Sequence, residues 1–329
     1  MDEVKLENLK FLGIFGILHE TFKLTHQWRK IFTQITLLFI LPLSLLFFAN
    51  METSNFFLQK ISQEKTILQQ TQISTPQFLK LSHLVSSEKL YSSLFSFTFL
   101  ILSSIFSLLS TSAIVYTVAC IYAARDVSFT LVMAVLPKVS KQLLITFFCY
   151  FASLFAFTFV AIGVLCLIPV IAILIYGLNT DQNFLLGIET IFFFFSISYC
   201  IGVWYLTTIW QLSSVVAVLE KSCGFKAMAK SKGLLKGKMK MVIMLWVSTW
   251  VGRSILGICW VLLFMVFLLV KLVLETVVYF VCKLHHGERV DKLALWNHLQ
   301  GYISPHHYDQ LKVDDDNNSV QLENIEAVR

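Results

Sequence analysis

The sequence predicts an all-α, polytopic integral membrane protein with six transmembrane helices and three in-plane amphipathic helices. Three observations support this prediction. Hydrophobic residues make up 57% of the 329 residues and charged residues only 14%, a balance that soluble globular domains do not show. The apolar residues form long continuous runs, whereas the strands of a membrane barrel alternate apolar and polar residues. The basic residues gather in short segments between those runs, as in cytosolic loops.

Residues 1–30 are predicted to be a cytosolic, interfacial segment that leads into the membrane domain, residues 31–282. Five apolar side chains within residues 7–24 recur on one face of an in-plane helix: Phe11, Ile14, Phe15, Leu18 and Phe22. The first residues are acidic and lack an early apolar stretch, so we expect no cleaved signal peptide. The first span then remains as a signal anchor.

The first span covers residues 31–48, and Pro42 within it is expected to kink the helix. The following residues, 51–89, are rich in Gln, Ser and Thr and carry charges of both signs. This polarity predicts an exoplasmic loop. The segment contains no glycosylation sequon, so its side of the membrane depends on the distribution of charge.

The second, third and fourth spans cover residues 94–124, 143–175 and 185–218. Residues 125–141 are basic and amphipathic, which predicts a further in-plane helix that ends at Pro137. Small polar residues recur at helical spacing along the second span: Ser103, Ser107, Ser110 and Thr111. Such a stripe is typical of closely packed helices in lipid. A pore lining is the alternative interpretation.

Residues 219–240 carry seven lysines between two apolar runs and predict the third in-plane helix. On a helical wheel, small and apolar residues share one arc: Gly224, Ala227, Met228, Ser231, Leu234 and Leu235. The opposite arc holds the candidate site, four lysines expected to contact anionic lipid: Lys226, Lys230, Lys232 and Lys236. We expect this helix to lie flat on the inner leaflet. The alternative is that its lysines only set the orientation of the spans.

Residues 241–282 are almost wholly apolar. A straight helix of this length would measure about 63 Å, roughly twice the thickness of the hydrocarbon layer. The segment should therefore fold back as two spans, residues 241–252 and 256–282, with a turn within residues 250–257.

Two charged residues of the last span, Lys271 and Glu275, are spaced i,i+4 and can pair, which lowers the cost of burying each. Residues 283–329 are predicted to be a soluble cytosolic tail with an acidic end. The tail begins with a short helix that bears Leu293, Trp296 and Leu299.

Cysteine and histidine residues near the last span raise two further possibilities. Cys223 and Cys282 are juxtamembrane and are candidates for S-acylation. Thiolate and imidazole groups also suit zinc, and the candidate ligands are Cys282, His285, His286, His306 and His307. No second paired cluster follows at a zinc-finger spacing, so we expect surface histidines and predict no metal and no cofactor.

The distribution of basic residues predicts the topology. Twenty of the 26 Lys and Arg residues lie in segments assigned to one side of the membrane and five in segments assigned to the other. The positive-inside rule then places both termini and residues 219–240 in the cytosol.

Four segments carry a resemblance to a known family: ILHETFKL, IFTQITLLFILPLSLLF, VLEKSCGFKAMAKSKGLLKGKM and ETVVYFVCKLHHGERVDKLALWNHLQGYI. The chain resembles, over nearly its whole length, a plant family of uncharacterised six-span transmembrane proteins. It is more distantly similar to the membrane domain of bacterial glycerophosphodiester phosphodiesterases, whose catalytic domain it lacks. The resemblance implies a plant endomembrane setting and no hydrolase activity.

The function predicted from these features is that of a non-enzymatic membrane protein that organises, shapes or regulates membrane. We expect it in the endoplasmic reticulum, another secretory-pathway membrane or the plasma membrane, with lipids, anionic ones among them, as partners and no nucleic acid. No pairing of nucleophile and base can be assigned, so we expect no enzyme. The alternative is a small transporter or channel, indicated by a repeated order of span, basic helix and span.

Overall fold

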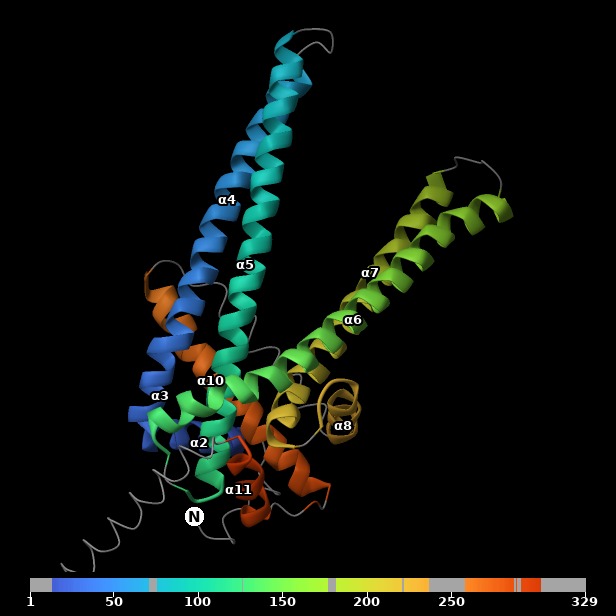
Figure 1. The fold of residues 1–329 in the computed structure, drawn as a ribbon. Helices are drawn as coiled ribbons and strands as arrows, with labels where there is room; N and C mark the ends of the chain where they lie inside the picture. Colours follow the sequence, from blue (N-terminus) through green and yellow to red (C-terminus); the bar gives the residue numbers. More distant parts are fainter. Residues whose placement is uncertain are drawn as a thin grey trace, which may run out of the picture.

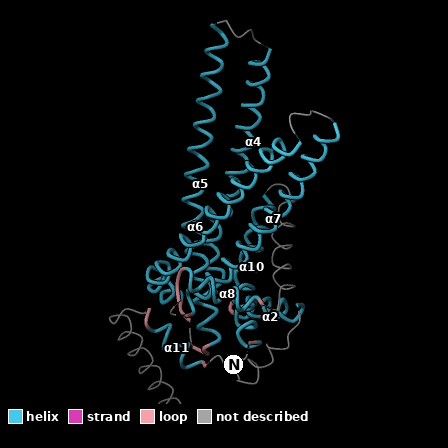
Figure 2. Tube along the Cα trace, turned by 90° about the vertical axis from the view of Figure 1, so that its right-hand side faces the viewer, coloured by secondary structure: helices cyan, strands magenta, loops and turns pink. Residues whose placement is uncertain are grey.

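The computed structural model of the chain describes residues 14–70, 76–125, 127–176, 182–220, 222–236, 258–286, 288 and 291–302. All regular secondary structure within these residues is helical (Figure 2). Two pairs of long helices rise from a common base and diverge (Figure 1). The first pair is α4 (Leu41–Gln70) with α5 (Pro76–Tyr122), and the second is α6 (Phe129–Tyr176) with α7 (Gln182–Leu219).

Five helical segments of the described residues are long and apolar enough to cross a membrane: Arg29–Glu64, His83–Tyr122, Phe129–Ile168, Glu189–Leu219 and Val261–His285. They correspond to five of the six predicted spans, and the fold is that of a multi-pass, all-helical membrane protein. The remaining predicted span, residues 241–252, and the turn within residues 250–257 lie outside the described residues. The count of six therefore stays a prediction.

Residues 51–89 do not form the predicted loop, because α4 continues through Gln70 and α5 begins at Pro76. Proline suits the first position of a helix, and no glycine or other proline interrupts this segment. Lys60 of α4 also forms an ion pair with Glu88 of α5. α5 has 47 residues, about 70 Å of helix against about 30 Å of hydrocarbon. The polarity of this segment therefore does not mark the end of the helix.

Residues 125–141 are likewise not a separate in-plane helix, since α6 runs from Phe129 straight through Pro137. An interior proline costs about 3 kcal/mol in a helix. Val135 and Val139 on either side of it are 1% and 0% exposed, and burying two such side chains contributes about 3–6 kcal/mol. The packing of its neighbours thus outweighs the break expected at Pro137.

A kink is expected at Pro42, and the structure has a π-helical turn just before it. The first span begins as α3 (Arg29–Ile35), widens into η2 (Thr36–Ile40) and continues as α4. Proline lacks an amide N–H and crowds the preceding turn. A π turn is one way in which a helix accommodates this missing hydrogen bond and the crowding.

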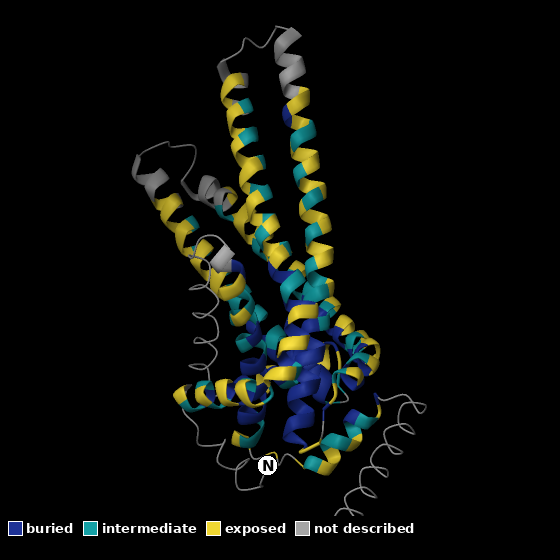
Figure 3. Ribbon diagram, turned by 90° about the vertical axis from the view of Figure 1, so that its left-hand side faces the viewer, coloured by how far each residue is buried: buried dark blue, intermediate teal, exposed yellow. Residues whose placement is uncertain are grey.

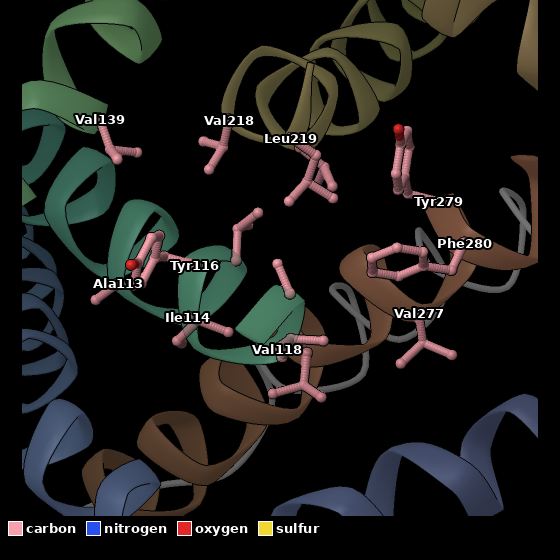
Figure 4. Packing of buried hydrophobic residues seen from close by; sticks show 14 of the residues in the cluster. Ala113, Ile114, Tyr116, Val118, Val139, Val218, Leu219, Val277, Tyr279 and Phe280 are labelled. Atoms are coloured by element: carbon pink, nitrogen blue, oxygen red, sulfur yellow. The ribbon is translucent and has the colours of Figure 1, made fainter. Parts of the chain in front are cut away.

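The buried core lies at the base and not along the long helices (Figure 3). The lower ends of α5, α6, α7 and α10 (Ile258–His285) meet there. Figure 4 shows their side chains converging, among them Ile114, Val139, Val218 and Phe280. Above the base the helices expose large apolar side chains: Phe97, Phe155, Phe159, Phe193 and Phe194. Such surfaces are stable in lipid, where outward apolar side chains are solvated by acyl chains.

α2 (Ile14–Gln27) packs against α10 at the base. Phe15 and Phe22, two residues of the predicted lipid face, are 86% and 56% exposed, as an in-plane helix requires. A second stripe that the pattern did not single out is buried, formed by Ile17, Thr21 and Leu24. α2 therefore has a protein-facing stripe in addition to its outward face.

Candidate functional site

The candidate site is built on α8 (Phe225–Leu235), which follows Gly224. Gly224 has φ +66° and ψ −136°, a conformation that L-residues avoid. Its amide donates to Thr146 Oγ1 of α6 at 3.1 Å. A Cβ at this position would lie 3.1 Å from Cys149 Sγ. The backbone at Gly224 thus lies directly against α6, and this close approach determines where α8 begins.

One arc of α8 is buried in protein: Ala227, Met228, Ser231, Leu234 and Leu235. It packs against α7, α10 and α6. The wheel pattern predicts this arc correctly, and the prediction that the helix lies flat on the inner leaflet stays a prediction. The lower ends of the neighbouring helices cover the arc, and nothing in the local sequence reveals that surface.

The opposite arc of α8 is exposed and basic. It carries Lys226, Lys232 and Lys236, and Phe225 beside them is 61% exposed. Gly233 lies on the same arc, with no atom within 4 Å of a Cβ built there. We call Phe225, Lys226, Lys232 and Lys236 the basic arc.

The basic arc begins at the level where the apolar surface of α6 begins. Gly224 donates a hydrogen bond to Thr146 of α6, and the nearby residues Ile145 and Phe148 of α6 are 51% and 63% exposed. Phe225 follows Gly224 directly. An exposed aromatic ring with lysines around it, at the edge of an apolar surface, is the composition of a helix that lies at the lipid headgroups.

Lys230, the fourth lysine of the predicted site, is held by protein. Its Nζ lies 2.8 Å from Glu220 Oε2, just past the end of α7. Glu220 Oε1 also accepts from Lys283 Nζ at 2.8 Å and from Tyr279 Oη at 2.6 Å, both on α10. Glu288 Oε2 lies 3.4 Å from Lys230 Nζ and 3.8 Å from Lys283 Nζ. We call these five residues the Glu220 network, and it ties α7, α8 and α10 together.

The charges of the Glu220 network are mutually stabilised. Burial alone would raise the pKa of Glu220, but the hydrogen bonds from Lys230, Lys283 and Tyr279 outweigh it and hold the pKa below its usual range. Burial would lower the pKa of Lys230, yet its hydrogen bond to Glu220 and the nearby carboxylates raise it. The charged state of each of these two residues is favoured by the other, so Glu220 and Lys230 stay ionised around neutral pH.

The helix predicted in the tail is present as α11 (Lys292–Gln300), but it is docked on the base and not free. Leu299 is fully buried, although Leu293 is 62% exposed. The Arg125 guanidinium lies 5.2 Å from the centroid of the Trp296 ring, within the range of a cation–π contact. The predicted soluble tail therefore begins with a helix that belongs to the folded base.

Tyr302, just past α11, joins three segments of the base. Its hydroxyl donates to Gln142 Oε1 of α6 at 2.6 Å and lies 3.2 Å from the Val218 carbonyl of α7. Burial raises the pKa of Tyr302 to about 12, so the hydroxyl keeps its proton. Its partners are 160 and 84 residues away in the chain, and sequence reasoning missed this contact for that reason.

Two further polar features predicted from the sequence are an ion pair on α10 and a stripe of hydroxyl groups on α5. The predicted pair in the last span is confirmed, with Lys271 Nζ 3.6 Å from Glu275 Oε1. On α5, Ser110 and Thr111 both donate to the Ser107 carbonyl of their own helix. Such bonds to the preceding turn satisfy these hydroxyls within the helix.

The cysteine and histidine residues near the end of α10 do not form a cluster. Cys282 is 1% exposed, too buried for S-acylation in the folded protein, whereas Cys223 is exposed. His286 Nε2 lies 3.2 Å from the Leu234 carbonyl. Among the described residues no group of three metal-ligating side chains comes together. His306 and His307 lie outside those residues.

Comparison with known proteins adds one family. A family model described as a domain of unknown function (DUF8558) matches residues 1–251 and 242–325. The chain belongs to this family. No curated protein and no solved structure matches the chain. The description of this family names no activity.

Proposed function

We propose that this DUF8558 protein is a non-enzymatic organiser of membrane lipid, and that the basic arc of α8 is its contact surface for anionic headgroups. The observation that carries the proposal is the fixed direction of this arc. The buried arc and Gly224 lock α8 onto the base, so Lys226, Lys232 and Lys236 face outward together. Each basic residue near an anionic surface contributes on the order of 1 kcal/mol, screened over about 8 Å at physiological salt.

Lys230 belongs to this proposal in a different role from the one predicted. Its ammonium group is occupied by Glu220 and Glu288, so it holds α8 in place and is not available to lipid. The exposed lysines and Phe225 are the lipid contacts, and the Glu220 network is the part that positions them.

We further propose that the base faces the cytosol of a plant endomembrane. The excess of basic residues in the segments that form the base supports this orientation, and anionic lipids are concentrated in cytosolic leaflets. The family resemblance supports the compartment. The alternative of a transporter or channel gains no support from the hydroxyl stripe of α5, whose groups bond within their own helix.

The orientation can be tested with engineered glycosylation sequons. A sequon beside Gln70, at the end of α4, should receive a glycan, and a sequon beside Lys236 on the basic arc should not. The measurement is an endoglycosidase-sensitive change in gel mobility after expression in a eukaryotic cell. The reverse pattern would place the base outside the cytosol.

The lipid contact can be tested by neutralising the three exposed lysines, Lys226→Gln, Lys232→Gln and Lys236→Gln, in the full chain. In nanodiscs, wild-type protein should enrich phosphatidylserine over phosphatidylcholine around itself. In the triple variant, the preference should fall about fivefold for each lysine neutralised, because each lysine contributes about 1 kcal/mol. Spin-labelled lipids measure the preference directly.

Two variants make this test specific. The same three positions changed to arginine keep the charge and should keep the preference. Neutralising Lys60, whose ammonium group already pairs with Glu88 far from the base, should leave the preference unchanged. A triple glutamine variant that still selects anionic lipid would show that the lysines only mark orientation.

A further inference from the structure

α2 presents a stripe of alternating phenylalanine and histidine side chains to the outside of the base. Phe15, His19, Phe22 and His26 follow one another at helical spacing within this helix, so their side chains lie along one side of it. Phe15 is 86% and Phe22 56% exposed, and both histidines are exposed as well. We call these four residues the α2 stripe.

The outward direction of the α2 stripe is fixed by the opposite side of the helix. Ile17, Thr21 and Leu24 are buried there, about half a turn of the helix away from the stripe. α2 packs against α10, at the base of the long helices (Figure 2). Since the docked side is apolar and fully covered, the stripe cannot turn inward without exposing it.

The surface that the α2 stripe meets is the membrane. Only Trp28 separates α2 from α3, where the first membrane-spanning segment begins. Leu37 and Leu38 of that segment are 54% and 46% exposed, as side chains in contact with lipid are. A helix joined to one span and packed against another is held at the membrane surface. Exposed phenylalanine rings beside basic residues suit the boundary between headgroups and acyl chains.

The charge around the α2 stripe is positive. Lys23, Arg29 and Lys30 are exposed beside it, and Glu20 is the one acidic residue in the sequences of α2 and α3. Neither histidine of the stripe forms an ion pair or a hydrogen bond with a residue that the structure describes. α10 lies against the opposite side of α2, and three of its charged side chains are already paired within α10 or with Glu220: Lys271, Glu275 and Lys283.

We propose that the α2 stripe is a second contact for anionic lipid headgroups, and that protonation of His19 and His26 strengthens it. Histidine is the side chain whose charge changes between about pH 5 and pH 8. In the neutral form, the imidazole rings extend the aromatic surface of the stripe. In the charged form, they donate charge-assisted hydrogen bonds to phosphate oxygens. The lysines of the basic arc stay charged throughout this range, so only the α2 stripe responds to pH.

The inference rests on the proposed function only in placing the base beside anionic lipid. Nanodiscs with phosphatidylglycerol and phosphatidylcholine in both leaflets meet that condition in either orientation. The phosphodiester of phosphatidylglycerol stays ionised at both about pH 7.5 and about pH 5.5, so a change with pH reports the protein. Spin-labelled lipids measure the preference for phosphatidylglycerol around the full chain. In the wild type, this preference should rise on acidification by about fivefold for each histidine that becomes charged.

Two pairs of substitutions assign the rise to the α2 stripe. His19→Gln with His26→Gln should remove it and leave the preference at about pH 7.5 unchanged, because glutamine is neutral at both values. His19→Lys with His26→Lys should give the higher, acidic preference at both values. All four substitutions are at exposed positions, so α2 should stay docked on α10.

The lysines of the basic arc provide the control. Lys226→Gln, Lys232→Gln and Lys236→Gln together should lower the preference at both pH values and keep the rise on acidification. Failure of the basic arc and failure of the α2 stripe therefore give different results. The inference is overturned if the wild-type preference is equal at the two pH values, as it would be with another protein covering the stripe. It is also overturned if the double glutamine variant keeps the full rise.

Discussion

Replacing Glu220 by alanine is expected to loosen α8 from the base. The carboxylate of Glu220 accepts bonds from Lys230, Lys283 and Tyr279, and its side chain is only 14% exposed. Removing it leaves two ammonium groups that share Glu288 alone. Losing bonds of this kind costs roughly 2 kcal/mol, which corresponds to about 30-fold faster amide exchange in α8. Hydrogen–deuterium exchange with mass spectrometry measures this exchange rate.

A matched control is available at the far end of the molecule. Glu88→Ala also removes a carboxylate that pairs with a lysine, but its partner Lys60 is 41% exposed. Exposed pairs contribute about 0–1 kcal/mol, so this variant should leave exchange in α8 unchanged. If Glu220→Ala and Glu88→Ala behave alike, the Glu220 network does not hold α8.

The same network predicts how docking depends on pH. The pKa of Glu220 is lower in the folded protein than in the unfolded chain, so the unfolded chain binds the proton first as pH falls. The contribution of Glu220 is complete above its usual pKa of about 4.3 and is lost as pH falls through the lower, folded value. The protection factor of α8, which is the exchange rate corrected for the intrinsic pH dependence of amide exchange, should be constant from neutral pH to about pH 5 and fall in more acidic solution. Glu220→Gln should abolish this fall.

Replacing Gly224 by valine is expected to have a comparable or larger effect. Its φ of +66° and ψ of −136° are strained for any L-residue, and a Cβ would press on Cys149 Sγ at 3.1 Å. Strain of this kind costs about 1–3 kcal/mol, and overpacking adds a similar amount. We expect α8 to undock, which trypsin cleavage at its lysines would report. Unchanged cleavage would show that α8 is held elsewhere.

Gly233 provides the control within the same helix. It lies inside α8 on the exposed arc, and a Cβ there meets no atom within 4 Å. Gly233→Ala should therefore stabilise the helix by about 1 kcal/mol, since alanine has the higher helix propensity. Gly224 is required by its close approach to α6, whereas Gly233 can be replaced.

Helical spans and the two arcs of α8 could be predicted because they depend on periodicity within one segment. Lys271 and Glu275 were paired correctly for the same reason, since i,i+4 neighbours meet in any helix. The polar residues 51–89 were misjudged because polarity reports the solvent around a segment and not its backbone conformation. Pro137 was misjudged because burial of the adjacent valines outweighs its local cost.

Sequence by itself determined the class of this protein, the approximate extent of its spans and which face of α8 is basic. These follow from composition and local spacing, which act over a few residues. Tertiary structure alone decided that α8 and α11 dock on a common base and that Lys230 pairs with Glu220. The physical reason is distance along the chain: Glu220 meets Lys283 across 63 residues and Tyr302 meets Gln142 across 160. Contacts of that separation leave no periodic trace, because they arise only when whole helices pack together.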